Sequence, residues 1–294
     1  MPRACLHPLG YPVEIVSGEA AVLDAASELW ASWPRLFDAP PVRVEVNVHS
    51  GPAPLSRPRF TAPAGWMRFC SDDLNFAEFD ETSRLGVLSI ARDALDSPLF
   101  RHHFLEALAL TALDAVFFTP LHAACVSRAS RGTLLCGDSG AGKSSLAYAC
   151  ARRGWTLVSD DAVHLAPGIS RIGVGGSNTI RLRPPARELF PDLAAVCAAT
   201  APNGKPALEI DALEHGFSAS RFATIGQCIF LRRRPGPAAW REIHPDQALD
   251  YFLKYLFPRD TARARRHLRE LLDSPVMALE YERIEDAAAA LEAL

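Results

Sequence analysis

The amino-terminal part of the chain shows two kinds of hydrophobic pattern. Val44, Val46 and Val48 alternate with polar residues, which is typical of a strand with one buried face. Residues 84–92 predict another strand, and the apolar run 98–117 predicts a long helix that ends before Pro120. We expect this helix to lead into the next domain. The pattern predicts a smaller α+β domain over residues 1–117. It does not assign this domain a role, and acceptor recognition and assembly are the two candidates.

The pattern changes to α/β in the remaining residues, 118–294. A hairpin of strands at 122–126 and 133–136, joined by a polar turn, is followed by a helix at 143–153 that ends at Gly154. Further predicted elements are a strand at 155–159, a strand at 225–231, helices at 246–256 and 260–272, a strand at 276–281 and a helix from Ile284. The predicted fold class is therefore α/β, with a second, smaller α+β domain at the amino terminus.

Composition narrows the class of protein. The chain has 294 residues, of which 49% are hydrophobic and 22% charged, as expected for a globular protein. A net charge of −3 gives no electrostatic basis for binding nucleic acid or an anionic membrane. The sequence shows neither a run of about 18 apolar residues, as a membrane helix needs, nor the apolar core of a signal peptide. We therefore expect a cytoplasmic protein. Its seven cysteines are never spaced as C-x-x-C, so neither zinc nor a disulfide framework is predicted.

Residues 137–144 form a complete G-x-x-x-x-G-K-S phosphate-binding loop. Such a loop wraps a polyphosphate with backbone N–H groups at a helix N-terminus, while its lysine reaches the β- and γ-phosphates and its hydroxyl holds Mg²⁺. Lysine is rare here: Lys143, Lys205 and Lys254 are the only three among 31 basic residues. The predicted nucleotide-binding residues are Gly137, Asp138, Ser139, Gly140, Ala141, Gly142, Lys143, Ser144 and Ser145.

Two aspartates follow the loop at a spacing that can return them to its level. Asp160 comes 17 residues after Lys143, and Asp161 is its neighbour. A helix of about 11 residues rises roughly 16 Å, and a short strand returns about as far. The pair should therefore lie level with the loop, at the carboxyl ends of neighbouring strands. There the carboxylates can hold metal-bound water or accept a proton from an attacking hydroxyl. The alternative is that Asp161 only caps the next turn.

His122 is a further candidate. If the two strands around the polar turn pair so that residue 126 faces 133, residue 122 lies beside Gly137. The imidazole would then lie at the mouth of the loop. The alternative is an ordinary surface or core histidine.

Phosphoryl transfer also needs a cation that clamps phosphate in the transition state. Lys205, in the turn-like Pro-Asn-Gly-Lys-Pro, is the first candidate, and Arg181 is the second. The arginines at 232–234 and at 263, 265, 266 and 269 are interpreted as solvated surface.

Four segments together resemble the HPr kinase/phosphorylase family, and more closely its divergent bacterial relatives. They are Leu-His-Ala-Ala-Cys-Val (121–126), the phosphate loop (137–144), Arg-Arg-Gly-Trp (152–155) and Val-Ser-Asp-Asp-Ala-Val (158–163). The resemblance implies a fold like that of the phosphoenolpyruvate carboxykinases and ATP-dependent phosphorylation of a serine hydroxyl.

The resemblance also implies a role for each site residue. Lys143 would contact the phosphates, Ser144 and Asp161 would serve the Mg²⁺, Asp160 would be the base toward the acceptor hydroxyl, and His122 would assist near the γ-phosphate. ATP and Mg²⁺ are the implied cofactors. Because members of that family form hexamers, the resemblance also implies a homo-oligomer.

The chain also departs from that family. HPr kinases carry an acidic residue followed by Arg-Gly-Leu-Gly beyond the aspartates, whereas here no acidic residue lies between Asp161 and Glu188. This argues against reverse phosphorolysis and against HPr as the substrate. Three hypotheses stay open: a kinase acting on a hydroxyl of a small molecule, peptide or protein; a regulatory nucleotide-binding subunit; and, more weakly, carboxykinase chemistry on an oxo-acid.

Overall fold

The computed structural model describes residues 1–51, 55–62, 65–168, 171–176, 178–200, 205–256 and 261–294. Contacts divide the chain into two compact units, Met1–Phe117 and Phe118–Leu294. Residues 202–204 of the predicted Pro-Asn-Gly-Lys-Pro turn and residue 260 of a predicted helix lie outside the described residues.

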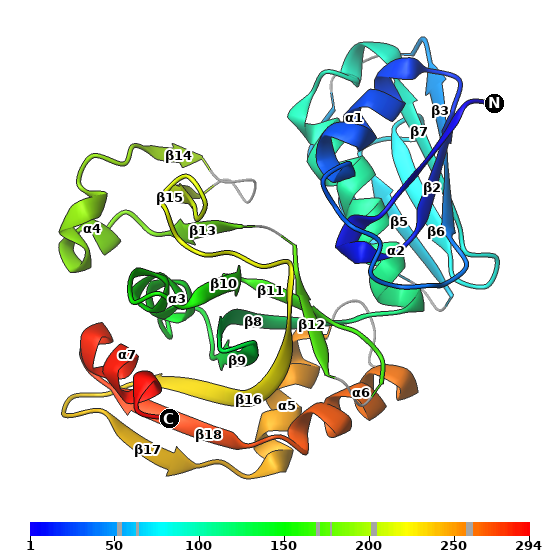
Figure 1. Ribbon diagram of the computed structural model, residues 1–294. Coiled ribbons are helices and arrows are strands. Elements are labelled where there is room, and N and C mark those ends of the chain that lie inside the picture. Colours follow the sequence, from blue (N-terminus) through cyan, green and yellow to red (C-terminus); the bar gives the residue numbers. More distant parts are fainter. Residues whose placement is uncertain (52–54, 63–64, 169–170, 177, 201–204, 257–260) are drawn as a thin grey trace. The chain divides into compact units, whose positions relative to one another are not determined.

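The first unit is a seven-stranded sheet with helices on one face (Figure 1). Its strands, in the spatial order β1-β2-β3-β7-β6-β5-β4, are β1 (Arg3–Leu6), β2 (Val13–Ser17), β3 (Val42–His49), β4 (Arg59–Thr61), β5 (Trp66–Cys70), β6 (Phe76–Asp80) and β7 (Leu85–Ala91). Its helical segments are η1 (Pro8–Gly10), α1 (Ala20–Trp30), η2 (Arg92–Ala94), η3 (Phe100–Glu106) and α2 (Ala107–Val116). Val42, Val44 and Val46 are buried while Arg43 is exposed, which confirms the predicted strand.

The helix predicted over residues 98–117 is present, but it is not uniform. Its first part, η3, is wound as a π-helix, and its second part is α2. The whole segment belongs to the first unit, and the chain enters the second unit at Phe118.

The second unit is built on an eight-stranded mixed sheet. The strands are β8 (Thr119–Arg128), β9 (Arg131–Cys136), β10 (Thr156–Ser159), β11 (Ala162–Leu165), β12 (Ile172–Gly175), β16 (Phe222–Arg233), β17 (Ala239–Glu242) and β18 (Val276–Tyr281). β9 pairs antiparallel with β8 and parallel with β16, which in turn pairs parallel with β18. The carboxyl ends of β9, β16 and β18 therefore meet at one edge of the sheet.

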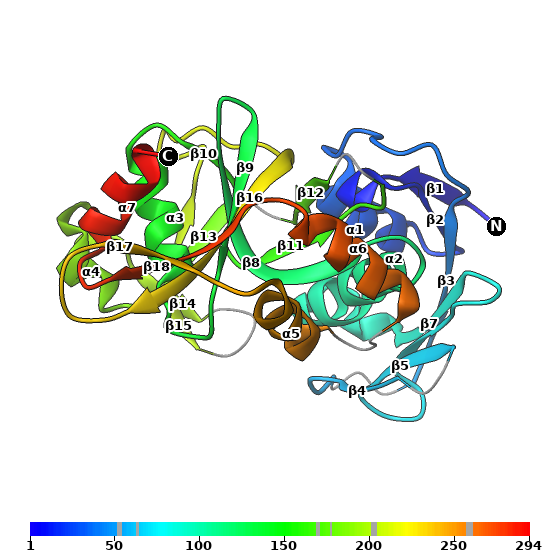
Figure 2. The same cartoon turned by 90° about the horizontal axis from the view of Figure 1, so that it is seen from below.

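Helices cover both faces of this sheet (Figures 1 and 2). One face packs against α3 (Lys143–Arg152) and α7 (Ile284–Glu292), and the other against α5 (Pro245–Tyr255) and α6 (Ala262–Leu272). Alternate residues of β8 face opposite cores: Ala124 and Val126 pack on the α3 side, and Ala123 and Cys125 on the α5 side.

A small second sheet lies beside α3. It consists of β13 (Thr179–Leu182), β14 (Ala198–Thr200) and β15 (Pro206–Asp211), with β15 in the middle. The short helices α4 (Ala186–Leu189) and η4 (Pro191–Leu193) follow β13 in the chain. This sheet, together with β11 and β12, was not predicted from the sequence.

A buried polar contact joins α6 to β8. The Nδ1 of His267 lies 2.9 Å from the Oγ1 of Thr119, and both residues are buried. Burial lowers the pKa of His267, and the neighbouring Arg263 lowers it further. The folded state therefore favours the neutral imidazole.

We predict that this histidine makes stability depend on pH. Because its pKa is lower in the folded state, its contribution is present above about pH 6.5 and is lost as the pH falls below that value. His267→Asn cannot titrate, so the melting temperature of the wild type should drop relative to that of the variant between pH 8 and pH 5. If the melting temperatures of the wild type and the variant differ by the same amount at pH 8 and at pH 5, the prediction is contradicted.

Candidate active site

The phosphate loop follows β9 and leads into α3. Gly137, Gly140 and Gly142 all have positive φ, at 147°, 89° and 101°. Gly142 is required for a second reason, because a Cβ there would lie 2.2 Å from the hydroxyl of Tyr281. Helix α3 begins with Lys143, and no side chain of the described residues caps its N-terminus. The first N–H groups of α3 are therefore available to an anion, beside the positive end of the helix dipole.

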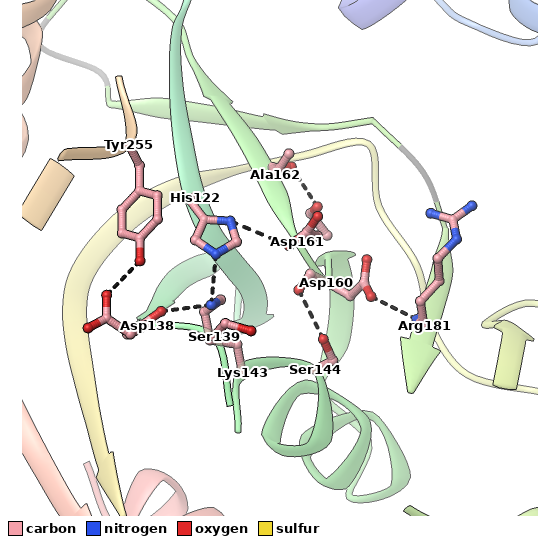
Figure 3. A network of polar contacts seen from close by, with 12 residues as sticks. His122, Asp138, Ser139, Lys143, Ser144, Asp160, Asp161, Ala162, Arg181 and Tyr255 are labelled. Atoms are coloured by element: carbon pink, nitrogen blue, oxygen red, sulfur yellow. Dashed lines mark hydrogen bonds and ion pairs between the residues drawn. The ribbon is translucent and has the colours of Figure 1, made fainter. Parts of the chain in front are cut away.

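Lys143 lies at the centre of the site (Figure 3). It is buried, and its Nζ donates to the carbonyl oxygen of Gly137 at 2.7 Å and lies 3.1 Å from the Nε2 of His122. Burial lowers the pKa of Lys143, and the nearby Asp161, Asp138 and Asp160 oppose that effect. The ammonium carries donors only, so Nε2 of His122 accepts from it.

This contact fixes the state of His122. With Nε2 accepting, the ring proton of a neutral imidazole is on Nδ1, which lies 3.4 Å from the Oδ1 of Asp161. Burial and the Lys143 cation lower the pKa of His122, while Asp161 and Asp138 raise it. His122 is thus held as an oriented neutral ring between a cation and a carboxylate.

The hairpin register explains how His122 reaches the loop. Val126 pairs with Thr133, and Ala123 pairs with Cys136, the last residue of β9. The next pair in the ladder would join residue 122 to Gly137, as the sequence predicted. The turn is shorter than predicted, because β8 continues to Arg128 and β9 begins at Arg131.

The two aspartates lie between β10 and β11, in different surroundings. Asp160 is 5% exposed, and its Oδ2 accepts from the backbone N–H of Arg181 at 2.7 Å. Burial raises the pKa of Asp160 to about 7, and the N–H of Arg181 opposes this effect. The side chain of Asp161 is 71% exposed. Asp160 can therefore exchange a proton near neutral pH, and Asp161 is open to solvent.

One detail of the predicted arrangement was wrong. β10 does not neighbour β9, because β8 lies between them and pairs antiparallel with both. β10 and β9 consequently run in the same direction, so the aspartates still reach the edge that carries the loop. The intervening strand places His122 between the loop and the aspartates.

Helix α5 contributes three residues to the site that sequence reasoning missed. The hydroxyl of Tyr251 accepts from the N–H of Gly137 at 2.9 Å and lies within 2.9 Å of the carbonyl oxygens of Gly137 and His122. One turn further, Lys254 and Tyr255 donate to Oδ1 of Asp138 at 2.8 and 2.5 Å. These positions share one helix face, and the rarity of lysine was the only signal for Lys254.

Two further contacts involve aromatic rings. The Tyr255 ring lies against His122, with 4.7 Å between ring centroids. Tyr281, at the end of β18, donates to the carbonyl oxygen of Ala141 at 2.6 Å. Because β18 runs parallel to β16 and β16 to β9, Tyr281 ends on the same edge as the loop. Gly137 and Ala141 are thus each held by a tyrosine hydroxyl.

The predicted cationic candidates lie on or beside the small sheet. Nε of Arg181 pairs with Oε1 of Glu209 at 2.9 Å, so its backbone, and not its guanidinium, reaches Asp160. Lys205 is exposed and comes directly before β15. Arg183, just after β13, donates to the Oγ of Ser139 at 3.1 Å.

The donors available to a metal are few. Among the described residues, no three or more His, Cys, Asp or Glu side chains gather in a way that could hold one. The Oγ of Ser144 lies 3.5 Å from the carbonyl oxygen of Asp160, which places the hydroxyl beside the acidic pair. One hydroxyl and one exposed carboxylate suit Mg²⁺, which keeps several waters and takes further oxygens from substrate phosphates.

Comparisons with known proteins give similarities to solved structures alone. The chain matches no protein-family model and no curated protein. Among solved structures it is similar to the Hpr(Ser) kinase/phosphatase from Coxiella burnetii, with a TM-score of 0.34 and 18% identity over 60% of this chain and 92% of that chain. At this TM-score the likeness carries no functional conclusion, so function is inferred from this chain's own residues. Within the described residues, no helix has the length and apolar character needed to span a membrane.

We predict that Tyr251→Phe lowers both the stability of the protein and its affinity for a nucleoside triphosphate. It leaves the N–H of Gly137 without its acceptor, which should lower the free energy of unfolding by about 1–3 kcal/mol. It should also weaken binding of a nucleoside triphosphate, because the first loop residue loses its anchor. Chemical denaturation and equilibrium binding measure the two effects.

Tyr148→Phe is the matched control. The hydroxyl of Tyr148 donates to Asp192 at 2.6 Å, away from the loop. The control should lose stability to a similar extent without losing affinity. Equal loss of affinity in both variants would show that Tyr251 acts only through general stability.

Proposed function

We propose that this protein is an ATP- and Mg²⁺-dependent kinase that transfers the γ-phosphoryl group to a hydroxyl, serine in particular, of a small molecule, peptide or protein. The observation that carries the proposal is the convergence of Lys143, His122 and the Asp160–Asp161 pair on one edge of the sheet. The sequence resemblance to HPr kinases supports the same activity.

The loop and Lys143 would bind the nucleotide. The loop's N–H groups would surround the β-phosphate, and Lys143 would exchange its contact with the Gly137 carbonyl for phosphate oxygens. Ser144 and Asp161 would hold Mg²⁺ with the nucleotide's own phosphates. The bound ion would neutralise charge on the transferred group.

Asp160 is the proposed base. A carboxyl with a pKa near 7 is ionised often enough to accept a proton and basic enough to hold it. In the reaction the acceptor hydroxyl gives its proton to Asp160 while its oxygen bonds to the γ-phosphorus. The bond from that phosphorus to the β–γ bridging oxygen breaks, and ADP leaves with the electron pair. The N–H of Arg181 keeps the carboxyl in place.

His122 would act near the γ-phosphate. Its neutral ring is held between Lys143 and Asp161, so it can keep both groups oriented without adding charge.

A second candidate is a regulatory nucleotide-binding subunit whose occupancy switches partner binding. The absence of an acidic residue between Asp161 and Glu188 favours it, because the family's later metal-linked carboxylate has no counterpart in that stretch. Such a subunit would bind nucleotide but would form no phosphorylated acceptor.

Asp160→Asn tests the kinase assignment. The substitution keeps the shape of the side chain but removes the proton acceptor, so phosphoryl transfer should fall at least about 10²-fold. Affinity for ATP should stay within a few-fold. The measurement is mass spectrometry of free serine and of serine-containing peptides after incubation with ATP and Mg²⁺.

Asp192→Asn is the control. It also removes a carboxylate, one that accepts a hydrogen bond from Tyr148, and it should leave turnover unchanged. Unchanged turnover in Asp160→Asn would rule out the base assignment. ATP binding without any phosphorylated product in the wild type would favour the regulatory subunit.

Lys143→Ala tests whether the loop binds triphosphate. Loss of the buried ammonium should weaken ATP binding and prevent turnover, so ATP should no longer raise the melting temperature. Arg153→Ala removes a cation at the other end of α3, where it pairs with Glu285 and Glu292, and should keep the shift. A full thermal shift in Lys143→Ala would mean that triphosphate does not bind at this loop.

A further inference from the structure

Strand β13 leads from the acidic pair to the phosphate loop. At Arg181 its backbone N–H holds the carboxylate of Asp160 at 2.7 Å. Two residues on, a guanidinium nitrogen of Arg183 donates to Oγ of Ser139 in the loop at 3.1 Å. A spacing of two residues spans about 7 Å along a strand. One short segment therefore contacts both the proposed base and the loop.

The two arginines of this segment differ in their partners. Arg181 is paired with Glu209 across the small sheet, at 2.9 Å. Among the described residues Arg183 has no carboxylate partner, and the hydroxyl of Ser139 is neutral. A guanidinium has five N–H donors, and Ser139 takes one of them. The positive charge and the remaining donors of Arg183 are thus available to a ligand at the rim of the loop.

The backbone around Arg183 is also stiff. Leu182, before it, is buried in the core beside α3. Pro184 and Pro185 follow, and proline fixes its own φ and restricts the residue before it. Little conformational freedom of the backbone is then lost when the guanidinium binds a ligand. This is the property that a clamp for developing charge requires.

We propose that Arg183 is a catalytic residue of the kinase reaction, a guanidinium that contacts the γ-phosphoryl oxygens from the rim of the loop. This inference rests on the proposed function and replaces Lys205 and Arg181 as the clamp. Negative charge spreads over the transferred group as the bond to the bridging oxygen breaks, and an arginine placed there stabilises it. Lysine has no planar fork and reproduces only the charge.

The experiment compares Arg183→Gln with three other arginine variants, Arg183→Lys, Arg181→Gln and Arg241→Gln. Arg183→Gln should lower kcat for ADP formation by about 10²-fold or more and weaken an ATP analogue with an imido β–γ bridge more than ADP. Arg183→Lys should recover part of that loss. Arg241→Gln, an exposed arginine of β17 that pairs with Glu280, controls for the loss of one surface charge and should leave kcat unchanged. Melting temperatures of all variants establish that they are folded.

The outcomes separate this inference from the kinase assignment. A wild type that forms product and an Arg183→Gln variant with the same kcat would overturn the role of Arg183 alone. A larger loss in Arg181→Gln than in Arg183→Gln would assign the clamp to Arg181 instead. A wild type that binds ATP but forms neither ADP nor product would overturn both proposals.

Discussion

The register between β8 and β9 is the constraint on which the site depends. Pairing of Val126 with Thr133 makes Ala123 the partner of the last residue of β9, so the next residue, His122, falls beside the loop. A slip by one position would turn His122 to the other face of the sheet. Such a slip would also bury the wrong residues, because alternate positions of β8 serve two separate cores. Burial of the apolar side chains of β8 therefore fixes the position of His122.

Burial also separates the two aspartates, which are neighbours in the chain. Asp160 turns inward, where the loss of solvent raises its pKa to about 7 and the N–H of Arg181 supplies a partner. Asp161 stays in solvent and faces the imidazole of His122. A buried carboxyl can exchange a proton near neutral pH, whereas an exposed one is open to a cation. The turn between β10 and β11 thus gives two identical groups different chemistry.

The sequence was informative where contacts are local, and it failed where they are distant. His122, the loop and the aspartates lie within about 40 residues, and short apolar runs next to turn residues were enough to place their strands. β12 reads Ile-Gly-Val-Gly, whose glycines hide any alternation, so it was missed. Tyr251 and Tyr281 reach the loop across more than 100 residues of sequence, and nothing in a helix or strand pattern indicates such a contact. The order of strands, with β8 between β9 and β10, was equally invisible.

The use of lysine in a chain rich in arginine follows from the space at the loop. Lys143 is buried, and its ammonium fits between the Gly137 carbonyl and the Nε2 of His122, contacts that a compact charge with three donors can make together. A planar guanidinium is larger and carries its donors in a rigid fork, so it could not occupy the same point without displacing His122. At the open rim, where Arg183 meets Ser139, a broad fork has room and its extra donors are useful. The chain therefore uses a compact cation inside the loop and a forked one outside it, as each place requires.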